Sequence, residues 1–219
     1  MSGIAKFTKS TIIAALKEIR SRGWIKSNRN IHNDGAVGNT LEDLPGISEN
    51  NLPLPNAAEW ELKTQRKNTS ALLTLFHMEP SPRGLHITDY LLENYGWPHK
   101  QAGKKYPSNE KSFRQTLSYM KPTSRGFFID IDDDNQKIII RFDPSSIRDE
   151  VTDWKNNLIA DNKIKYDDDY IPYWGFHDVY HKAGIKLGNC FYVSADVRKE
   201  GGDYFYRYSD MFFTQKIFT

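Results

Sequence analysis

The chain has 219 residues, of which 38% are hydrophobic and 13% aromatic, and this composition excludes a disordered polypeptide. No apolar run approaches the ~20 residues that a membrane-spanning helix needs, and the N-terminus carries no apolar signal segment. We therefore expect a cytoplasmic protein that does not bind membranes. The single cysteine, Cys190, excludes an intrachain disulfide and lies in an apolar run typical of a buried strand.

The net charge of +2 conceals two basic segments. Residues 1–30 contain seven Lys or Arg against one acidic residue, and residues 99–125 again contain seven against one. Such segments are typical of proteins that bind a polyanion such as DNA. The alternative is that they form ordinary solvated helix faces.

The first half of the chain predicts two helices and two strands. Thr8 or Ser10 can cap a helix that ends at Gly23 and has a stripe of apolar residues (Ile12, Ile13, Leu16 and Ile19). A second helix is expected over residues 38–44. A strand over 59–64 and an apolar strand over 71–77 should follow.

The second half predicts a short helix over 87–95, a polar loop to residue 109, and a hairpin of strands 127–131 and 137–142. A helix near 173–183 and a strand pair, 190–197 with 204–208, come next. Asp210 could cap a last helix that begins at Met211. Helices interspersed with strands favour a mixed α/β sheet.

The strand that contains Glu61 and Lys63 carries the clearest chemistry. Side chains alternate along a strand, so these two residues share one face, while Trp60 and Leu62 point into a core. We expect Glu61 to hold Mg²⁺ at a solvent-facing cleft and Lys63 to assist an attacking water. Glu-x-Lys by itself is common on exposed strands.

The order of several short motifs is more specific than this pair. It runs from 38-GNTLEDL-44 and 49-ENNL-52 through 59-EWELKT-64 to 72-LLTLFH-77. This order resembles the MvaI/BcnI family of type II restriction endonucleases, which are relatives of the mismatch-repair nickase MutH. The resemblance is dense over about residues 8–85 and looser to about residue 213.

The resemblance implies a PD-(D/E)XK fold, in which a mixed sheet flanked by helices forms a two-lobed DNA clamp. It implies one endonuclease domain over 1–219, with a catalytic lobe over about 1–125 and a partial recognition lobe over about 126–219. Family members act as monomers on short GC-rich sites of double-stranded DNA with Mg²⁺. A cognate DNA methyltransferase is their functional, not physical, partner.

Carried over by position, Glu61 and Lys63 match the E-x-K part of the family motif. Glu42 matches a helical glutamate near the site, and His77 matches a histidine that approaches the DNA. We also expect DNA contacts from four basic residues, Lys67, Arg83, Lys104 and Lys105.

The chain departs from the family pattern in two ways. Asn56 replaces the aspartate that would bind the metal together with Glu61, and an amide brings no charge, so activity should be weak or lost. We also expect that the family's C-terminal part is missing after Thr219. The alternatives are a DNA-binding protein that does not cleave, or a MutH-like strand-nicking repair endonuclease.

Overall fold

The computed structural model describes residues 8–27, 35–44 and 60–215. The chain divides into two compact units, one formed by residues 1–77 with 180–219 and the other by residues 78–179. The lobe boundary that we expected near residue 125 lies inside the second unit. The difference arises because the last two strands of the chain return to pair with elements of its N-terminal part.

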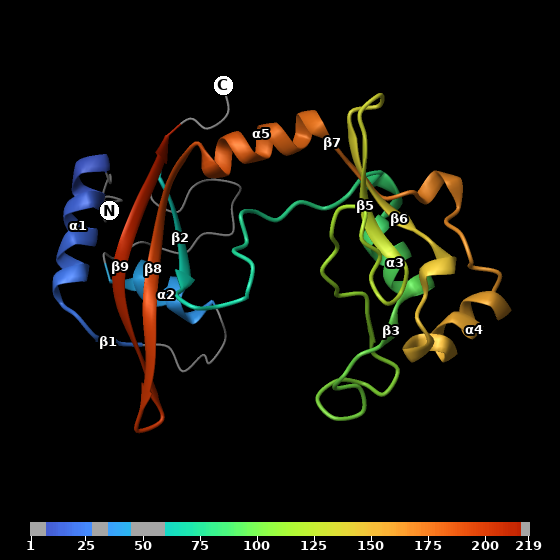
Figure 1. Ribbon diagram of the computed structural model, residues 1–219, viewed down its shortest axis with the longest axis horizontal. Helices are drawn as coiled ribbons and strands as arrows, with labels where there is room; N and C mark the ends of the chain where they lie inside the picture. The colour runs from blue at the N-terminus through green and yellow to red at the C-terminus, as the bar shows by residue number, and fades with distance from the viewer. Residues whose placement is uncertain (1–7, 28–34, 45–59, 216–219) are drawn as a thin grey trace, which may run out of the picture. The chain divides into compact units, whose positions relative to one another are not determined.

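A four-stranded sheet organises the first unit, in the order β1 (Ile25–Lys26), β9 (Asp203–Gln215), β8 (Asn189–Glu200) and β2 (Glu61–Arg66). β2 runs parallel to β8, whereas the other neighbouring strands are antiparallel. β8 and β9 form the long hairpin visible in Figure 1. Among the described residues, β2 is therefore an edge strand.

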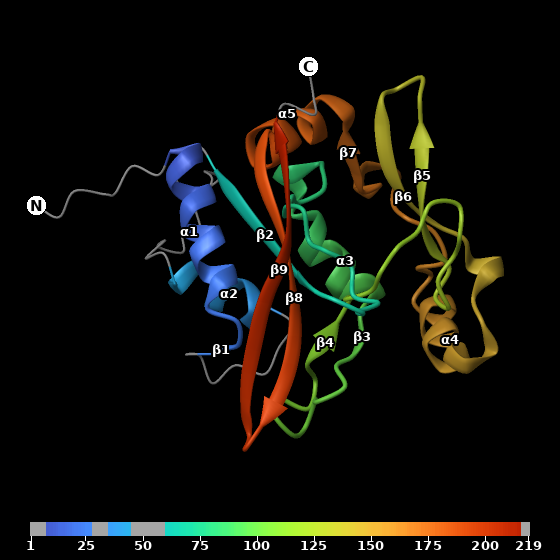
Figure 2. The same cartoon turned by 60° about the vertical axis from the view of Figure 1, so that its left-hand side comes forward.

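Helices α1 (Lys9–Ser21) and α2 (Ala36–Asp43) bury their apolar residues against this sheet. Thr8 caps α1, because its hydroxyl accepts a hydrogen bond from the backbone N–H of Thr11. Figure 2 shows both helices on one side of the β8–β9 hairpin. The shared core contains Ile12, Leu16, Val37, Leu41, Trp60, Leu62, Phe191 and Tyr206.

The second unit is built around a three-stranded antiparallel sheet of β5 (Phe127–Asp132), β6 (Lys137–Phe142) and β7 (Tyr173–Gly175). A two-stranded ribbon of β3 (Trp97–Pro98) and β4 (Lys111–Ser112) accompanies it. Its helices are α3 (Ile87–Tyr95) and α4 (Thr152–Ala160), with four short 3-10 helices at Arg83–Leu85, Pro144–Ser146, Asp149–Val151 and Asp168–Tyr170.

An aromatic core holds this second unit together. The ring of Tyr95 meets those of Phe127 and Tyr166 edge to face, and its hydroxyl donates a 2.7 Å hydrogen bond to the carbonyl of Lys165. The indole N–H of Trp154 donates to the carbonyl of Tyr95. Helix α5 (Phe176–Leu187) then carries the chain back into the first unit.

Several predicted elements are confirmed, among them α3, the β5–β6 hairpin and the β8–β9 pair. The predicted strand over 71–77 is wrong: the segment is irregular, and Leu72 is 80% exposed. An apolar run forms a strand only where another strand pairs with it, and no described strand pairs with this one.

Two predicted helices also differ from the structure. The helix from Met211 is wrong, because Met211 and Phe213 pair within β9 against Val193 and Phe191. Tertiary pairing outweighs the local capping signal of Asp210 there. The helix near 173–183 begins only at Phe176, after β7. Within the described residues, no helix is both long enough and apolar enough to cross a membrane.

Candidate active site

Glu61 and Lys63 lie side by side on β2, as the alternation of strand side chains predicts. Lys63 Nζ is 2.7 Å from Glu61 Oε1, and the pair forms a hydrogen-bonded salt bridge. Trp60 and Leu62 are buried in the core of the first unit, which confirms their predicted direction. The strand therefore separates a charged face from an apolar one.

The Glu61 carboxylate is more enclosed than we expected. Its side chain is only 5% exposed, so the prediction of a solvent-facing acid is wrong for this residue. Glu61 is paired in register with Cys190, which is fully buried on the neighbouring strand β8. Burial raises the pKa of the Cys190 thiol to about 11, which shows how poorly this position accommodates a new charge.

Lys186, in the last turn of α5, is a site residue that sequence analysis missed. Its Nζ lies 3.8 Å from Glu61 Oε2, and its side chain is only 13% exposed. Glu61 is thus approached by one ammonium group from its own strand and by another from a helix. Lys186 belongs to no motif, so only the folding of α5 against β2 could reveal it.

One oxygen of the acid remains open to a further partner. Glu61 Oε2 is buried and accepts no hydrogen bond from the residues that the structure describes. A buried carboxylate oxygen without a donor is costly, and it is the kind of hard ligand that Mg²⁺ prefers. The acid therefore fits a metal ligand, although the described segments contain no group of three His, Cys, Asp or Glu that could complete a site.

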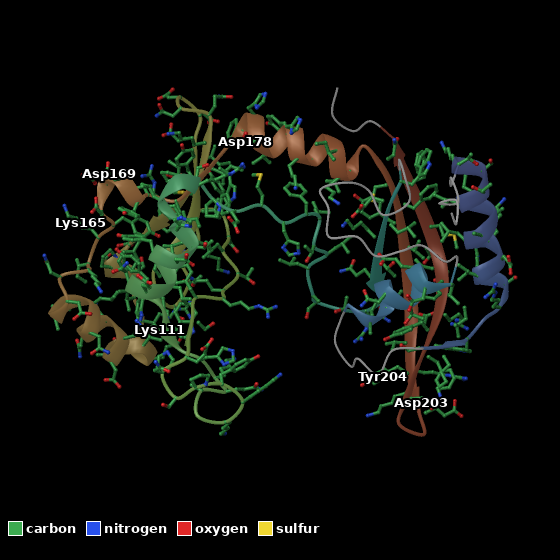
Figure 3. The ribbon with its side chains drawn as sticks, turned by 180° about the vertical axis from the view of Figure 1, so that it is seen from behind. Lys111, Lys165, Asp169, Asp178, Asp203 and Tyr204 are labelled. Atoms are coloured by element: carbon green, nitrogen blue, oxygen red, sulfur yellow. The ribbon has the colours of Figure 1, made fainter. Side chains whose placement is uncertain are left out.

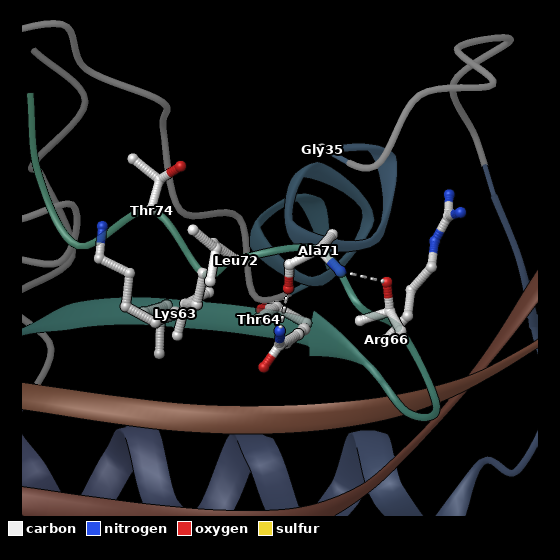
Figure 4. A pocket seen from close by; sticks show the side chains of 11 residues that line it. Gly35, Lys63, Thr64, Arg66, Ala71, Leu72 and Thr74 are labelled. Atoms are coloured by element: carbon white, nitrogen blue, oxygen red, sulfur yellow. Dashed lines mark hydrogen bonds between the residues drawn. The ribbon is translucent and has the colours of Figure 1, made fainter. Parts of the chain in front are cut away.

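A pocket of about 240 Å³ lies beside the edge of β2. Both Leu62 and Lys63 line it although they point to opposite faces, so the pocket follows the edge of the strand. Figure 4 shows the side chains of β2 and of the segment that follows it around this space. Gln65 fixes that segment by donating a 2.8 Å hydrogen bond to the carbonyl of Ala71. Lys63 thus lines a pocket at the strand edge, although its side chain is only 16% exposed and its ammonium group is held by Glu61.

The structure gives less information about the other two predicted catalytic residues, Glu42 and Asn56. Glu42 is half-buried near the end of α2, a helix that contacts β2. Asn56, which we predicted as a metal ligand, lies outside the described residues. Their catalytic roles stay predictions.

Two of the predicted DNA-binding residues form ion pairs. Lys67 Nζ is 2.7 Å from Asp210 Oδ2 on β9, and this hydrogen bond lowers the pKa of the Asp210 carboxyl. Arg83 Nη2 is 3.7 Å from an oxygen of Asp178, which lies in the first turn of α5 (Figure 3). Both cations remain partly exposed.

The other predicted DNA-binding residues are exposed. Lys104 and Lys105 lie in a turn of the second unit, where both backbone N–H groups donate to the carbonyl of Gln101. His77 lies in the irregular segment at the end of the first unit. Their exposure makes the three side chains accessible to a ligand.

A mixed sheet flanked by helices, with Glu-x-Lys on one strand, fits the PD-(D/E)XK class of nucleases. The sequence profile of the MvaI/BcnI restriction endonuclease family matches residues 13–219. The chain therefore belongs to this family, which confirms the resemblance found in the sequence and makes it a protein of the nuclease class.

A solved structure of a restriction endonuclease agrees with this fold. The chain is 23% identical to the restriction endonuclease MvaI in complex with its cognate DNA substrate, with a TM-score of 0.71 over 94% of this chain and 74% of that one. MvaI in the absence of DNA matches over the same shares with 21% identity and a TM-score of 0.38. No curated protein matched the sequence.

Proposed function

We propose that this chain binds double-stranded DNA at a short GC-rich site and hydrolyses a phosphodiester bond with Mg²⁺. The observation that carries the proposal is the buried Glu61, which has one oxygen held by Lys63 and the other without a hydrogen-bond donor among the described residues. Membership of a restriction endonuclease family supports the reaction type.

In this mechanism Glu61 and the amide oxygen of Asn56 would hold the metal. Bound Mg²⁺ would supply positive charge to the phosphate and polarise the attacking water. Lys63 fixes the Glu61 carboxylate by its 2.7 Å hydrogen bond, and on the strand edge it would orient the water. Lys186 adds a second positive charge on the other side of the acid, and Glu42 would tune the site from α2.

Asn56 sets the expected rate. An amide oxygen can bind Mg²⁺ but contributes no negative charge, so metal affinity and cleavage should be weak in this chain. Acting as a monomer, the protein would hold DNA through phosphate contacts from Lys67, Arg83, Lys104 and Lys105, with His77 nearer the bases. A cognate methyltransferase would protect the same site.

A plasmid assay tests the proposal. We expect Asn56→Asp to nick and then linearise supercoiled DNA in Mg²⁺ much faster than the unaltered chain. The double variant Asn56→Asp with Glu61→Gln should be inactive yet still shift DNA in a gel. If Asn56→Asp neither cuts nor binds DNA at high Mg²⁺, the proposal fails.

The second candidate is a DNA-binding protein that does not cleave, which the uncharged Asn56 favours. It predicts that the unaltered chain retards DNA in a gel, and that restoring the aspartate produces no cleavage.

A further inference from the structure

An exposed turn in the second unit presents two large apolar side chains to solvent. Ser118 and Lys121 pair across this turn, and Tyr119 and Met120 form its tip. Tyr119 is 62% exposed and Met120 is 59% exposed. The same segment buries other apolar residues, since Phe113 and Leu117 pack against the aromatic core. The two tip residues therefore stand out as apolar groups left in water.

Met120 also has an unusual backbone conformation. Its φ is +51°, in the left-handed region that glycine and asparagine favour. The four other non-glycine residues with positive φ in the described segments are polar: Asn68, His86, Gln136 and Asn162. An exposed position with this backbone would be more stable with Gly or Asn. Strain of this kind is concentrated at functional sites.

The turn is held rigidly although its tip is exposed. The backbone N–H of Met120 donates a 2.8 Å hydrogen bond to the carbonyl of Ile129 on β5, and the N–H of Ile129 donates a 2.9 Å bond to the carbonyl of Ser118. The hydroxyl of Thr123 donates to Gln115 across the base of the turn. The tip is thus presented in a fixed direction.

The surroundings of the tip identify its partner by charge. Lys121 adjoins it, Arg114 is also exposed, and the whole segment 99–125 has seven basic residues against one acidic. A hydrophobic protein surface would not require this charge, whereas a duplex offers phosphates to the cations and base pairs to the apolar groups. Apolar side chains, methionine among them, are known to wedge between base pairs and unstack them.

We propose that the Tyr119–Met120 turn is a wedge that enters the bound duplex, with Met120 between base pairs and Tyr119 against a base. This inference rests on the proposed function, because it assumes that the chain binds double-stranded DNA. The backbone strain at Met120 is retained because the wedge needs an apolar group at the tip.

The test uses Met120→Gly and Met120→Asn, which both suit the left-handed backbone but remove the apolar group. Gln136→Gly is the matched control, because Gln136 is exposed, has φ +53°, and lies in a turn rich in Asp. Binding is measured by anisotropy of a dye-labelled pool of GC-rich duplexes, without Mg²⁺ and over a range of salt. Duplex bending is followed by energy transfer between its ends.

We expect both Met120 variants to bind DNA about tenfold more weakly at every salt concentration and to bend it less. Their thermal unfolding midpoints should be unchanged or higher. The slope of log affinity against log salt should stay as in the wild type, because no phosphate contact is lost. Gln136→Gly should bind and bend DNA normally.

Wild-type affinity and bending in the Met120→Asn variant would overturn the wedge while leaving the proposed function intact. A lower salt slope in that variant would also overturn it. The wedge would also be overturned if light scattering showed that the wild type self-associates and that the Met120→Asn variant is a monomer. Absence of duplex binding by the wild type would instead refute the proposed function, and the wedge with it.

Discussion

Lys186 Nζ lies 3.8 Å from Glu61 Oε2, so a helix near the end of the chain supplies a second cation to the acid of an early strand. Both side chains are largely withdrawn from water. Lys186 therefore adds a positive charge to the site although it is not part of the E-x-K motif.

Lys186→Met should slow DNA nicking on the order of a hundredfold in the Asn56→Asp background, because a preorganised positive charge beside Glu61, at the proposed active site, is lost. The Mg²⁺ concentration that gives the half-maximal rate should fall, since the ammonium group of Lys186 no longer competes with the metal ion for Glu61. Nicking rates over a Mg²⁺ titration provide the measurement. Lys182→Met, one turn earlier on α5, is the control, and equal slowing in both variants would contradict the role of Lys186.

Glu61→Gln should destabilise the fold as well as abolish cleavage. The substitution removes the anion with which both Lys63 and Lys186 pair, and it leaves these two largely buried cations without it. Removing one member of a buried ion pair typically costs about 3 kcal/mol. Urea unfolding should show this loss. Glu200→Gln, which breaks an exposed pair with Arg198, should change stability by less than about 1 kcal/mol.

Lys104→Ala and Lys105→Ala should weaken binding to duplex DNA by a charge effect. Each should reduce the slope of log affinity against log salt by about 1 and affect all sequences alike. Anisotropy titrations at several salt concentrations measure this slope. Lys163→Ala, in the more acidic part of the second unit, should leave it unchanged. An unaltered slope in both Lys104 and Lys105 variants would exclude them as phosphate contacts.

Cys190 should make the stability of the first unit depend on pH. Burial raises the pKa of its thiol from 9.0 to about 11 in the folded protein. The neutral thiol is thus favoured by folding, so this stabilisation is complete below pH 9 and is lost as the pH rises toward 11. The loss amounts to about 2 kcal/mol. Urea midpoints from about pH 8 to 11 should fall more steeply for the wild type than for Cys190→Ala, and parallel curves would contradict the prediction.

Gly126→Ala should destabilise the second unit. Gly126 has φ +80°, and an added Cβ would overlap the carbonyl oxygen of Asp143. Backbone cannot move aside cheaply, so we expect a cost of about 3 kcal/mol in thermal or urea unfolding. Gly201→Ala is the matched control, because that glycine has φ +58° with no atom within 4 Å. It should cost about 1 kcal/mol, and similar values for the two variants would refute the steric argument.

The sequence alone determined the features that depend on local chemistry. The apolar stripe of α1, the turn of the β5–β6 hairpin and the alternation of Trp60, Glu61, Leu62 and Lys63 could all be predicted. Each is set by side-chain periodicity and turn composition over a few residues. The order of short motifs indicated the family as well, because that order is a property of the chain itself.

Only the tertiary structure decided which distant residues meet. The apolar run over 71–77 does not form the predicted strand, because no described strand pairs with it. Met211 lies in β9 and not in a helix, because it pairs with Val193 of β8. The burial of Glu61 and the approach of Lys186 likewise depend on α5 folding back after the whole second unit. Long-range pairing and desolvation are properties of the assembled chain, and no local pattern encodes them.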